Sequence, residues 1–167
     1  MMKTKFHNML IILLFICHPL IAGQGSAGAK FLQINTTTRG SANAGTMVAR
    51  PGLIDALSYN PATTATLTGS NFVIHHSNYF VDMSFDYMSF TYNVPSFGTI
   101  SMGLLGLLSG DIEETTELQP LGTGRTFTAN DFAGFVSFAR SITDKFSGGG
   151  TIKYVIQNID KLTASGI

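Results

Sequence analysis

The sequence predicts an all-β protein, an antiparallel transmembrane β-barrel that is incomplete in this chain and follows an irregular amino-terminal segment. Only 12% of the residues are charged and 18 are glycine, which leaves few hydrated groups to cover a soluble globule. Apolar and polar residues alternate through stretches of about ten residues, as in membrane-crossing strands. Short and long connections alternate between these stretches, as do the turns and loops on the two sides of a membrane.

Residues 1–23 have the form of a signal peptide. Lys3 and Lys5 provide a positive start, residues 9–17 are an unbroken apolar run, and small residues follow. The run is too short to cross a bilayer as a helix, and an interfacial anchor is the alternative. Without Lys3 and Lys5, 8 of the 10 basic residues remain against 10 acidic ones, a net charge of about −2 that excludes a typical nucleic-acid binder. The only cysteine, Cys17, lies in this leader, so we expect no disulfide in the mature chain.

Residues 24–68 are predicted to form a packed, mostly irregular segment ahead of the sheet. They are rich in Gly, Ala, Thr and Asn and show no sustained helical or strand period. Phe31, Leu32 and Ile34 form a small apolar anchor. Residues 60–62, Asn-Pro-Ala, indicate a turn because proline fixes its φ angle and asparagine caps locally.

Residues 69–167 are predicted to be the first strands of the barrel. In 81–94 the phase of the alternation reverses near Tyr87, which indicates a bulge or a strand whose inner face becomes apolar at one end. The connections at 93–98 and 141–145 are short, and that at 109–125 is long and acidic. The alternating stretches are 71–79, 81–94, 98–108, 126–142 and 145–158.

The polar positions of this alternation are candidates for the barrel interior. In a membrane barrel, lipid-facing apolar residues alternate with polar residues that face the lumen. Such polar residues either contact a solute or only hydrate and pair inside the wall. The candidate lumen-facing residues are Asp82, Ser84, Asp86, Asp131, Thr151, Lys153 and Gln157.

Five strands and the start of a sixth are too few for closure, because the smallest membrane barrels have about 8. An open edge in lipid would leave unpaired backbone groups. We therefore expect residues 69–167 to be the truncated front of a longer barrel. A barrel shared among subunits is the alternative.

No residue pattern predicts an enzyme, a metal site or a cofactor. His75 and His76 are adjacent on a predicted strand and point to opposite faces, so they cannot share one metal ion. The acidic loop 109–125 lacks the ligand spacing and central glycine of an EF-hand and indicates a solvated outer loop. The glycines 148–150 lack the Lys-Ser/Thr of a phosphate loop, and the nucleophile motif G-x-S-x-G does not occur.

Several short motifs, in this order and spacing, resemble the PorV/PorQ family, a branch of the FadL-like outer-membrane barrels. Asn60, Pro61 and Ala62 match the NPA motif that precedes the first strand. Residues 109–124 resemble the family's "GDI..TT…GTG" loop, and 137–154 its "SYAR.LTDKF…KY" hairpin. Residues 43–47 depart from the usual "MGGA" stretch. The opening "G..FL.I....R" pattern is matched by Gly28, Phe31, Leu32, Ile34 and Arg39.

The resemblance covers residues 27–167 and implies a FadL-like barrel in the outer membrane of a Gram-negative-type bacterium, with residues 24–68 plugging or lining its lumen. It implies type IX protein secretion or transport of hydrophobic solutes, and it implies no catalytic residue. The expected partners are outer-membrane lipid and secretion-system components, cargo proteins or a hydrophobic small molecule, and no nucleic acid. The rival hypothesis is a secreted, water-soluble β-sandwich used for adhesion or binding.

Overall fold

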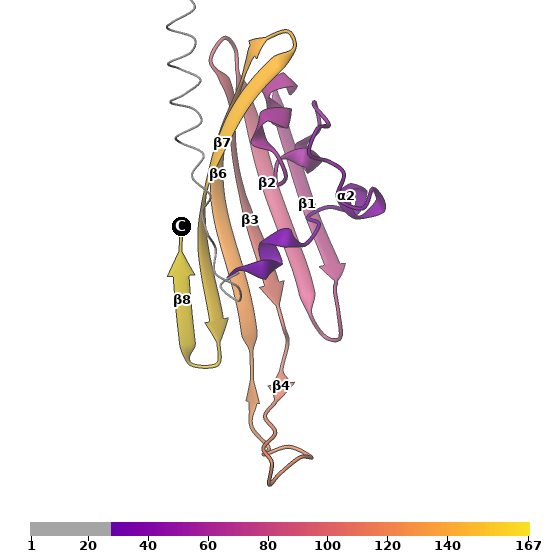
Figure 1. The fold of residues 1–167 in the computed structure, drawn as a ribbon, viewed down its shortest axis with the longest axis vertical. Helices are drawn as coiled ribbons and strands as arrows, with labels where there is room; N and C mark the ends of the chain where they lie inside the picture. The colour runs from indigo at the N-terminus through magenta and orange to yellow at the C-terminus, as the bar shows by residue number, and fades with distance from the viewer. Residues whose placement is uncertain (1–27) are drawn as a thin grey trace, which may run out of the picture.

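A computed structural model describes residues 28–167, which form one curved antiparallel sheet with an irregular segment against one face (Figure 1). The predicted leader, residues 1–23, lies outside the described residues. Each strand pairs with the next in the order β1-β2-β3-β6-β7-β8. The strands are β1 Ser70–Asn78, β2 Ser84–Val94, β3 Gly98–Leu108, β6 Ala129–Thr143, β7 Phe146–Ile159 and β8 Leu162–Gly166.

Within residues 28–167 the sheet is open, with β1 and β8 as its edges. The prediction of an antiparallel all-β fold is therefore confirmed. Closure into a barrel does not occur among these strands and stays a prediction. Four of the five pairings in the sheet join strands that are consecutive in the chain, and the fifth joins β3 to β6 across the β4–β5 hairpin, so the contacts are mostly local in sequence.

The phase reversal in β2 is explained without a bulge. The register between β1 and β2 is continuous along all nine residues of β1 and passes through Tyr87. Phe85 and Tyr87 are buried on one face of β2, and the next residues on that face are Ser89 and Thr91. The two faces of the strand thus exchange composition while the backbone stays regular.

Of the five strand connections in the main sheet only the one between β3 and β6 is long, so the predicted alternation of short and long connections is wrong for residues 70–166. β2 and β3 are joined by a tight turn in which Ser96 has a positive φ of 66°, and β7 and β8 by one in which Asp160 has a φ of 52°. Between β3 and β6 the chain extends beyond the sheet as a small hairpin of β4 Ile112–Glu113 and β5 Thr126–Phe127 (Figure 1). This extension is the long acidic loop of the sequence.

Residues 28–69 contain short helices joined by irregular backbone, as expected for this region. They cross one face of the sheet (Figure 1). None of the helices in residues 28–167 is long and apolar enough to span a membrane. The helices are η1 Lys30–Gln33, α2 Thr38–Ala42, η2 Ile54–Ala56 and η3 Pro61–Thr66.

The hydrophobic core lies between this amino-terminal segment and the sheet. Phe31 of η1 is buried there, with Leu32 and Ile34 packed at its border, as expected for the apolar anchor. The rings of Tyr87 and Phe135 stack with centroids 6.3 Å apart. Burying each large apolar side chain contributes about 1.5–3 kcal/mol, so this cluster fixes the segment on the sheet.

Candidate functional site: the two faces of the sheet

The two faces of the sheet differ in what lies against them. We call the face under residues 28–67 the covered face and the opposite one the apolar face. Successive residues of a strand point to opposite faces. Ile152 on the apolar face of β7 is 72% exposed, whereas the next residue, Lys153, is half-buried on the covered face.

The apolar face carries exposed hydrophobic side chains in rows across the strands. One row crosses five strands without a polar residue: Phe72, Phe90, Met102, Val136 and Ile152. The row on one side is Ile74, Met88, Leu104, Gly134 and Tyr154. The row on the other side is Ser70, Tyr92, Ile100, Phe138 and Gly150, which is polar on β1.

These rows form a band with two borders. Successive rows on one face are two residues apart, about 6.7 Å, so three rows and the partly apolar row beyond them span about 20 Å along the strands. At one end the next row holds Val94, Gly98, Arg140 and Gly148, so a charged residue lies at this border. The exposed Phe97, Ile142 and Phe146 lie around this border. At the other end it meets a mostly polar row of Asn78, Ser84, Leu108, Asn130 and Asn158.

The partly apolar row mixes two environments. On β6 and β7 it holds Phe132 and Ile156, and on β1 and β2 it holds His76 and Asp86. His76 Nδ1 lies 2.6 Å from Asp86 Oδ1, so the two polar groups satisfy each other at the edge of the band. The border between polar and apolar residues is therefore one row farther along the sheet at β6 than at β2. Such a shift is expected when the strands are tilted relative to a flat boundary.

The covered face carries a row of short polar side chains. Ser137 Oγ and Thr151 Oγ1 are 2.7 Å apart and hydrogen-bonded. Burial of this many polar groups is unusual for a sheet packed as a hydrophobic core. The row crosses five strands as Asn71, Thr91, Ser101, Ser137 and Thr151.

Four buried hydroxyls on this face have no hydrogen-bond partner among the described protein atoms. They belong to Tyr87, Ser89, Thr91 and Ser101. Buried hydroxyls are normally hydrogen-bonded, to protein or to ordered water. The covered face is therefore polar at the level of this row and apolar only around the Phe31 cluster.

Four of the seven candidate lumen-facing residues lie on the covered face. Asp131 is opposite Gln157 in the register between β6 and β7, and Thr151 and Lys153 lie farther along β7. Gln157 Oε1 accepts a hydrogen bond of 3.1 Å from the backbone N–H of Ala29, which fixes the start of the amino-terminal segment on the sheet. These four residues therefore share the face that the sequence pattern assigned to them.

The assignment of the other three to that face is wrong. Ser84 and Asp86 lie on the apolar face, in the parity of Met88. Asp82 lies in the turn before β2. The physical reason is the exchange of composition along β2: its first polar residues and its later apolar residues occupy the same face, so polarity does not identify one side of this strand.

The Asn-Pro-Ala motif caps η3 and places it on the sheet. Asn60 Oδ1 accepts from the Ala62 N–H at 3.1 Å, and Asn60 Nδ2 donates to the Val48 carbonyl at 2.9 Å. Pro61 occupies the first turn of η3, where a missing N–H costs no helical hydrogen bond. The predicted turn is thus a helix cap, and it lies on the covered face where β7 has Gly149, at which a Cβ atom would come 2.9 Å from the Ala62 nitrogen.

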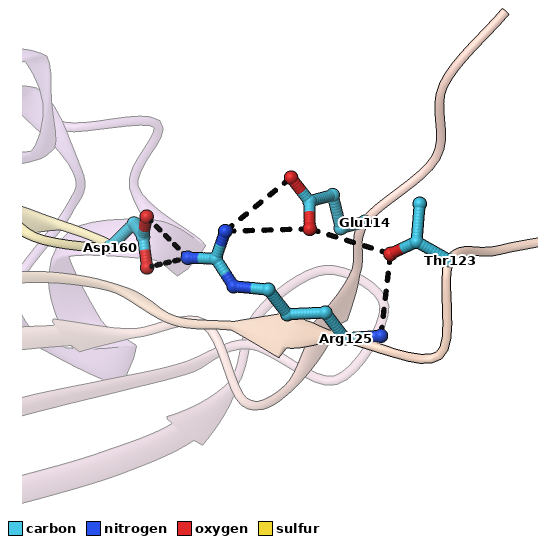
Figure 2. A network of polar contacts seen from close by, with 4 residues as sticks. All are labelled: Glu114, Thr123, Arg125 and Asp160. Atoms are coloured by element: carbon cyan, nitrogen blue, oxygen red, sulfur yellow. Dashed lines mark hydrogen bonds and ion pairs between the residues drawn. The ribbon is translucent and has the colours of Figure 1, made fainter.

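A polar network ties the β4–β5 hairpin to the turn between β7 and β8 (Figure 2). Arg125 Nη2 donates to both carboxylate oxygens of Asp160 at 2.5 and 2.6 Å, and Arg125 Nη1 lies 3.4 Å from Glu114 Oε2. The hydrogen bond from Arg125 is the main cause that lowers the pKa of Asp160, and the same pairing raises the pKa of Arg125. Both groups therefore stay charged over the physiological range.

The two adjacent histidines have separate partners on opposite faces. His75 Nδ1 lies 3.2 Å from Thr38 Oγ1 on the covered face, and His76 pairs with Asp86 on the apolar face. Within residues 28–167 there is no group of three or more His, Cys, Asp or Glu side chains placed to hold a metal ion.

Three features of the structure escaped the sequence interpretation. The hydroxyl row requires the register of four hairpins, which no local pattern provides. The contact at Gly149 joins residues far apart in the chain, although a run of three glycines in a strand does signal a close approach of backbone. Outside the two faces, the Arg125 network joins the long loop to a distant turn, which the acidic character of the loop alone does not predict.

We compared the chain with models of protein families, with curated proteins and with solved structures, and none of the three comparisons found a match. The resemblance to the PorV/PorQ family therefore depends on the short motifs alone.

Proposed function

We propose that this chain forms part of the wall of an outer-membrane β-barrel, with the apolar face in contact with lipid and the covered face toward the lumen. The observation that supports this proposal is the row of Phe72, Phe90, Met102, Val136 and Ile152, exposed side by side across five strands. Contiguous apolar patches of this kind on a protein surface mark contact with lipid or another protein.

The rival β-sandwich needs a second sheet over the apolar face. Among residues 28–167 the second sheet is the two-stranded β4–β5 extension, which lies beyond the end of the main sheet rather than over it (Figure 1). A sandwich would also keep polar residues on its outer faces and apolar residues inside. The reversed distribution here favours the barrel.

For the activity of the barrel we propose type IX protein secretion or transport of hydrophobic solutes, as the resemblance implies. Disruption of the gene in its host separates these two activities. Cargo proteins retained in the periplasm would support secretion. Reduced uptake of hydrophobic solutes with normal secretion would support transport, and loss of neither would contradict both.

The absence of tryptophan from the chain allows a direct test of lipid contact. Single tryptophans placed by Ile152→Trp and Lys153→Trp occupy successive positions on opposite faces of β7. In vesicles containing brominated lipid, we expect the fluorescence of the Ile152→Trp variant to be quenched and that of the Lys153→Trp variant to be largely retained. A third variant, Leu118→Trp in the exposed long loop, provides the unquenched reference.

Equal quenching at positions 152 and 153 would contradict a lipid-facing and a lumen-facing side. Circular dichroism of each variant in the same vesicles controls for folding. A chain that stays folded and monomeric in buffer without detergent or lipid would instead support the water-soluble sandwich.

A further inference from the structure

A polar cleft lies between the amino-terminal segment and β1, on the covered face. Its volume is about 600 Å³, within the range of about 300–1,000 Å³ typical of small-molecule sites. Lys30, Asn35 and Thr38 line it from the amino-terminal segment, and His75, Ser77 and Tyr79 line it from β1 and its end. Most small-molecule pockets are lined mainly by apolar side chains, so this polar lining indicates a polar occupant.

The hydrogen bonds around the cleft leave mainly donors for a ligand. Tyr59 donates its hydroxyl hydrogen to Asn35 Oδ1 at 2.9 Å, which uses one lone pair of that oxygen and leaves both N–H donors of the Asn35 side chain for a ligand. Thr38 Oγ1 lies 3.2 Å from His75 Nδ1. When Thr38 donates in this pair, the ring proton is on Nε2, and that nitrogen is a donor as well.

The charge of the cleft is positive. Lys30 lines it and has no ion-pair partner among residues 28–167, and no aspartate or glutamate of this range is among the lining residues. Asp55, which lines the neighbouring hollow beyond Thr38 and His75, is paired with Arg39 at 3.8 Å. An anion in the cleft would therefore meet a lysine and several donors, and no carboxylate in its wall.

We propose that this cleft binds a small anionic solute that also carries hydroxyl groups, such as a sugar acid or a sugar phosphate. Lys30 and the Asn35 amide would hold the anion by charge-assisted and neutral hydrogen bonds. Thr38, whose hydrogen is donated to His75, can still accept, and Ser77 can donate and accept, so they suit the hydroxyls of a sugar. The Tyr79 ring offers an apolar surface to its C–H groups. The site does not depend on contact of the apolar face with lipid.

Titration calorimetry of the full chain in detergent tests this proposal with glucuronate, glucose 6-phosphate, glucose and inorganic phosphate as probes. We expect saturable binding of glucuronate or glucose 6-phosphate, and binding of glucose and of inorganic phosphate about tenfold weaker or more. Lys30→Ala should weaken binding of the anionic sugars about tenfold, because one charge-assisted hydrogen bond is lost. Lys161→Ala, in the exposed turn between β7 and β8, is the matched control and should leave it unchanged.

Thr38→Val is a second variant that keeps the charge of the cleft and should weaken the anionic sugars without affecting inorganic phosphate. Absence of saturable binding for both anionic sugars would overturn the proposal. Equal loss in Lys30→Ala and Lys161→Ala would also overturn it, as would binding of glucose or inorganic phosphate as tight as that of the anionic sugars. Because the measurement is made in detergent and reports only on the cleft, its failure is separate from failure of the proposed lipid contact.

Discussion

The same strands form both faces of the sheet, but the two faces differ in composition. A water-soluble sheet has polar side chains on its exposed face and apolar side chains on its buried face, and here much of each face shows the reverse. On the apolar face, large hydrophobic side chains are exposed in adjacent rows, one of which crosses five strands without a break. On the covered face, serine and threonine hydroxyls are buried, and four buried hydroxyls lack a protein partner. In water the hydrophobic effect would select the reverse arrangement. The comparison teaches that exposure does not follow polarity in this sheet: exposed side chains of one face are apolar, and several buried side chains of the other are polar. This is the arrangement expected when hydrocarbon is the solvent of one face.

The covered face is not uniformly polar, and this limits the comparison. Phe85 is fully buried, and Phe135 stacks on Tyr87 under the amino-terminal segment. The hydroxyl row lies at a different level of the sheet from this cluster. Packing at one level fixes the segment on the sheet, and the level beside it is polar but also buried.

The largest predicted effect comes from a charge in the middle of the apolar face. Met102 lies in the central row and is 53% exposed. If this face meets lipid, Met102→Arg should lower the free energy of unfolding in vesicles by about 2–4 kcal/mol, because a buried guanidinium loses hydration. Urea titration of the vesicle-bound protein measures the change.

Leu118→Arg is the matched control, since Leu118 is 93% exposed in the long loop outside the strands. It should change the unfolding free energy by less than about 0.5 kcal/mol. An equally small effect of Met102→Arg would mean that the apolar face is in contact with water, and the distinction between the faces would be lost.

The second prediction compares two adjacent glycines of β7, Gly149 on the covered face and Gly150 on the apolar face. A Cβ at Gly149 would lie 2.9 Å from the Ala62 nitrogen and 3.0 Å from the Phe138 carbonyl oxygen, and at Gly150 it would meet no atom within 4 Å. Gly149→Ala should therefore destabilise the fold by about 1–3 kcal/mol through overpacking. Gly150→Ala should be neutral or stabilising by up to about 1 kcal/mol. Denaturant unfolding in detergent compares the two, and equal values would show that η3 does not press on this face.

A third, smaller effect is expected from the cap that holds η3. Asn60→Ala removes both the acceptor for the Ala62 N–H and the donor to the Val48 carbonyl. Loss of a helix cap costs about 1 kcal/mol, so the unfolding midpoint should fall slightly. Asn60→Asp keeps the acceptor and should lose less. If both substitutions are equally harmful, the bond to Val48 and not the cap is what stabilises the segment.

The sequence was sufficient for the parts of the molecule that depend on local patterns. Period-two alternation predicted five strands close to their observed positions. It also separated Thr151 and Lys153 from Ile152 and Tyr154 on the opposite face, because β7 keeps one polarity on each face over that stretch. It failed for Ser84 and Asp86, because polarity in β2 follows the level along the strand as well as the face. A side-chain pattern cannot separate these two influences without the register of the neighbouring strands.

The polar cleft could not be predicted for a related reason. Lys30, Asn35 and His75 carry no motif, and their sequence separation hides that the amino-terminal segment lies over β1. Likewise, Arg125 is an ordinary loop residue until the hairpins bring Asp160 beside it. Tertiary placement, and not residue type, makes these sites.

The smallest effect on global stability is expected from the Arg125 network, which lies beyond the ends of the long strands and outside both faces (Figure 2). Arg125→Gln should leave the unfolding midpoint nearly unchanged, because exposed ion pairs contribute little to stability. Its effect should be local: the backbone N–H groups of Glu114 and Thr123, which bond to Arg125 and Glu114 across the β4–β5 hairpin, should exchange faster with solvent. Hydrogen exchange of the folded protein measures this loosening, and Lys145→Ala in the exposed turn between β6 and β7 is the control.

Acid should loosen the hairpin in the same way. Because the pKa of Asp160 is lowered in the folded protein, its pairing with Arg125 is fully present above the ordinary aspartate value of 3.8 and is lost as the pH falls through the lowered value. Arg125 has a raised pKa and stays charged throughout, so the transition belongs to the carboxylate. After correction for intrinsic rates, protection at Glu114 and Thr123 should therefore persist at neutral and mildly acidic pH and fall only in stronger acid. Asp160→Asn should remove this pH dependence while leaving the two faces of the sheet intact, and an unchanged profile in that variant would show that the hairpin is held by its own backbone bonds alone.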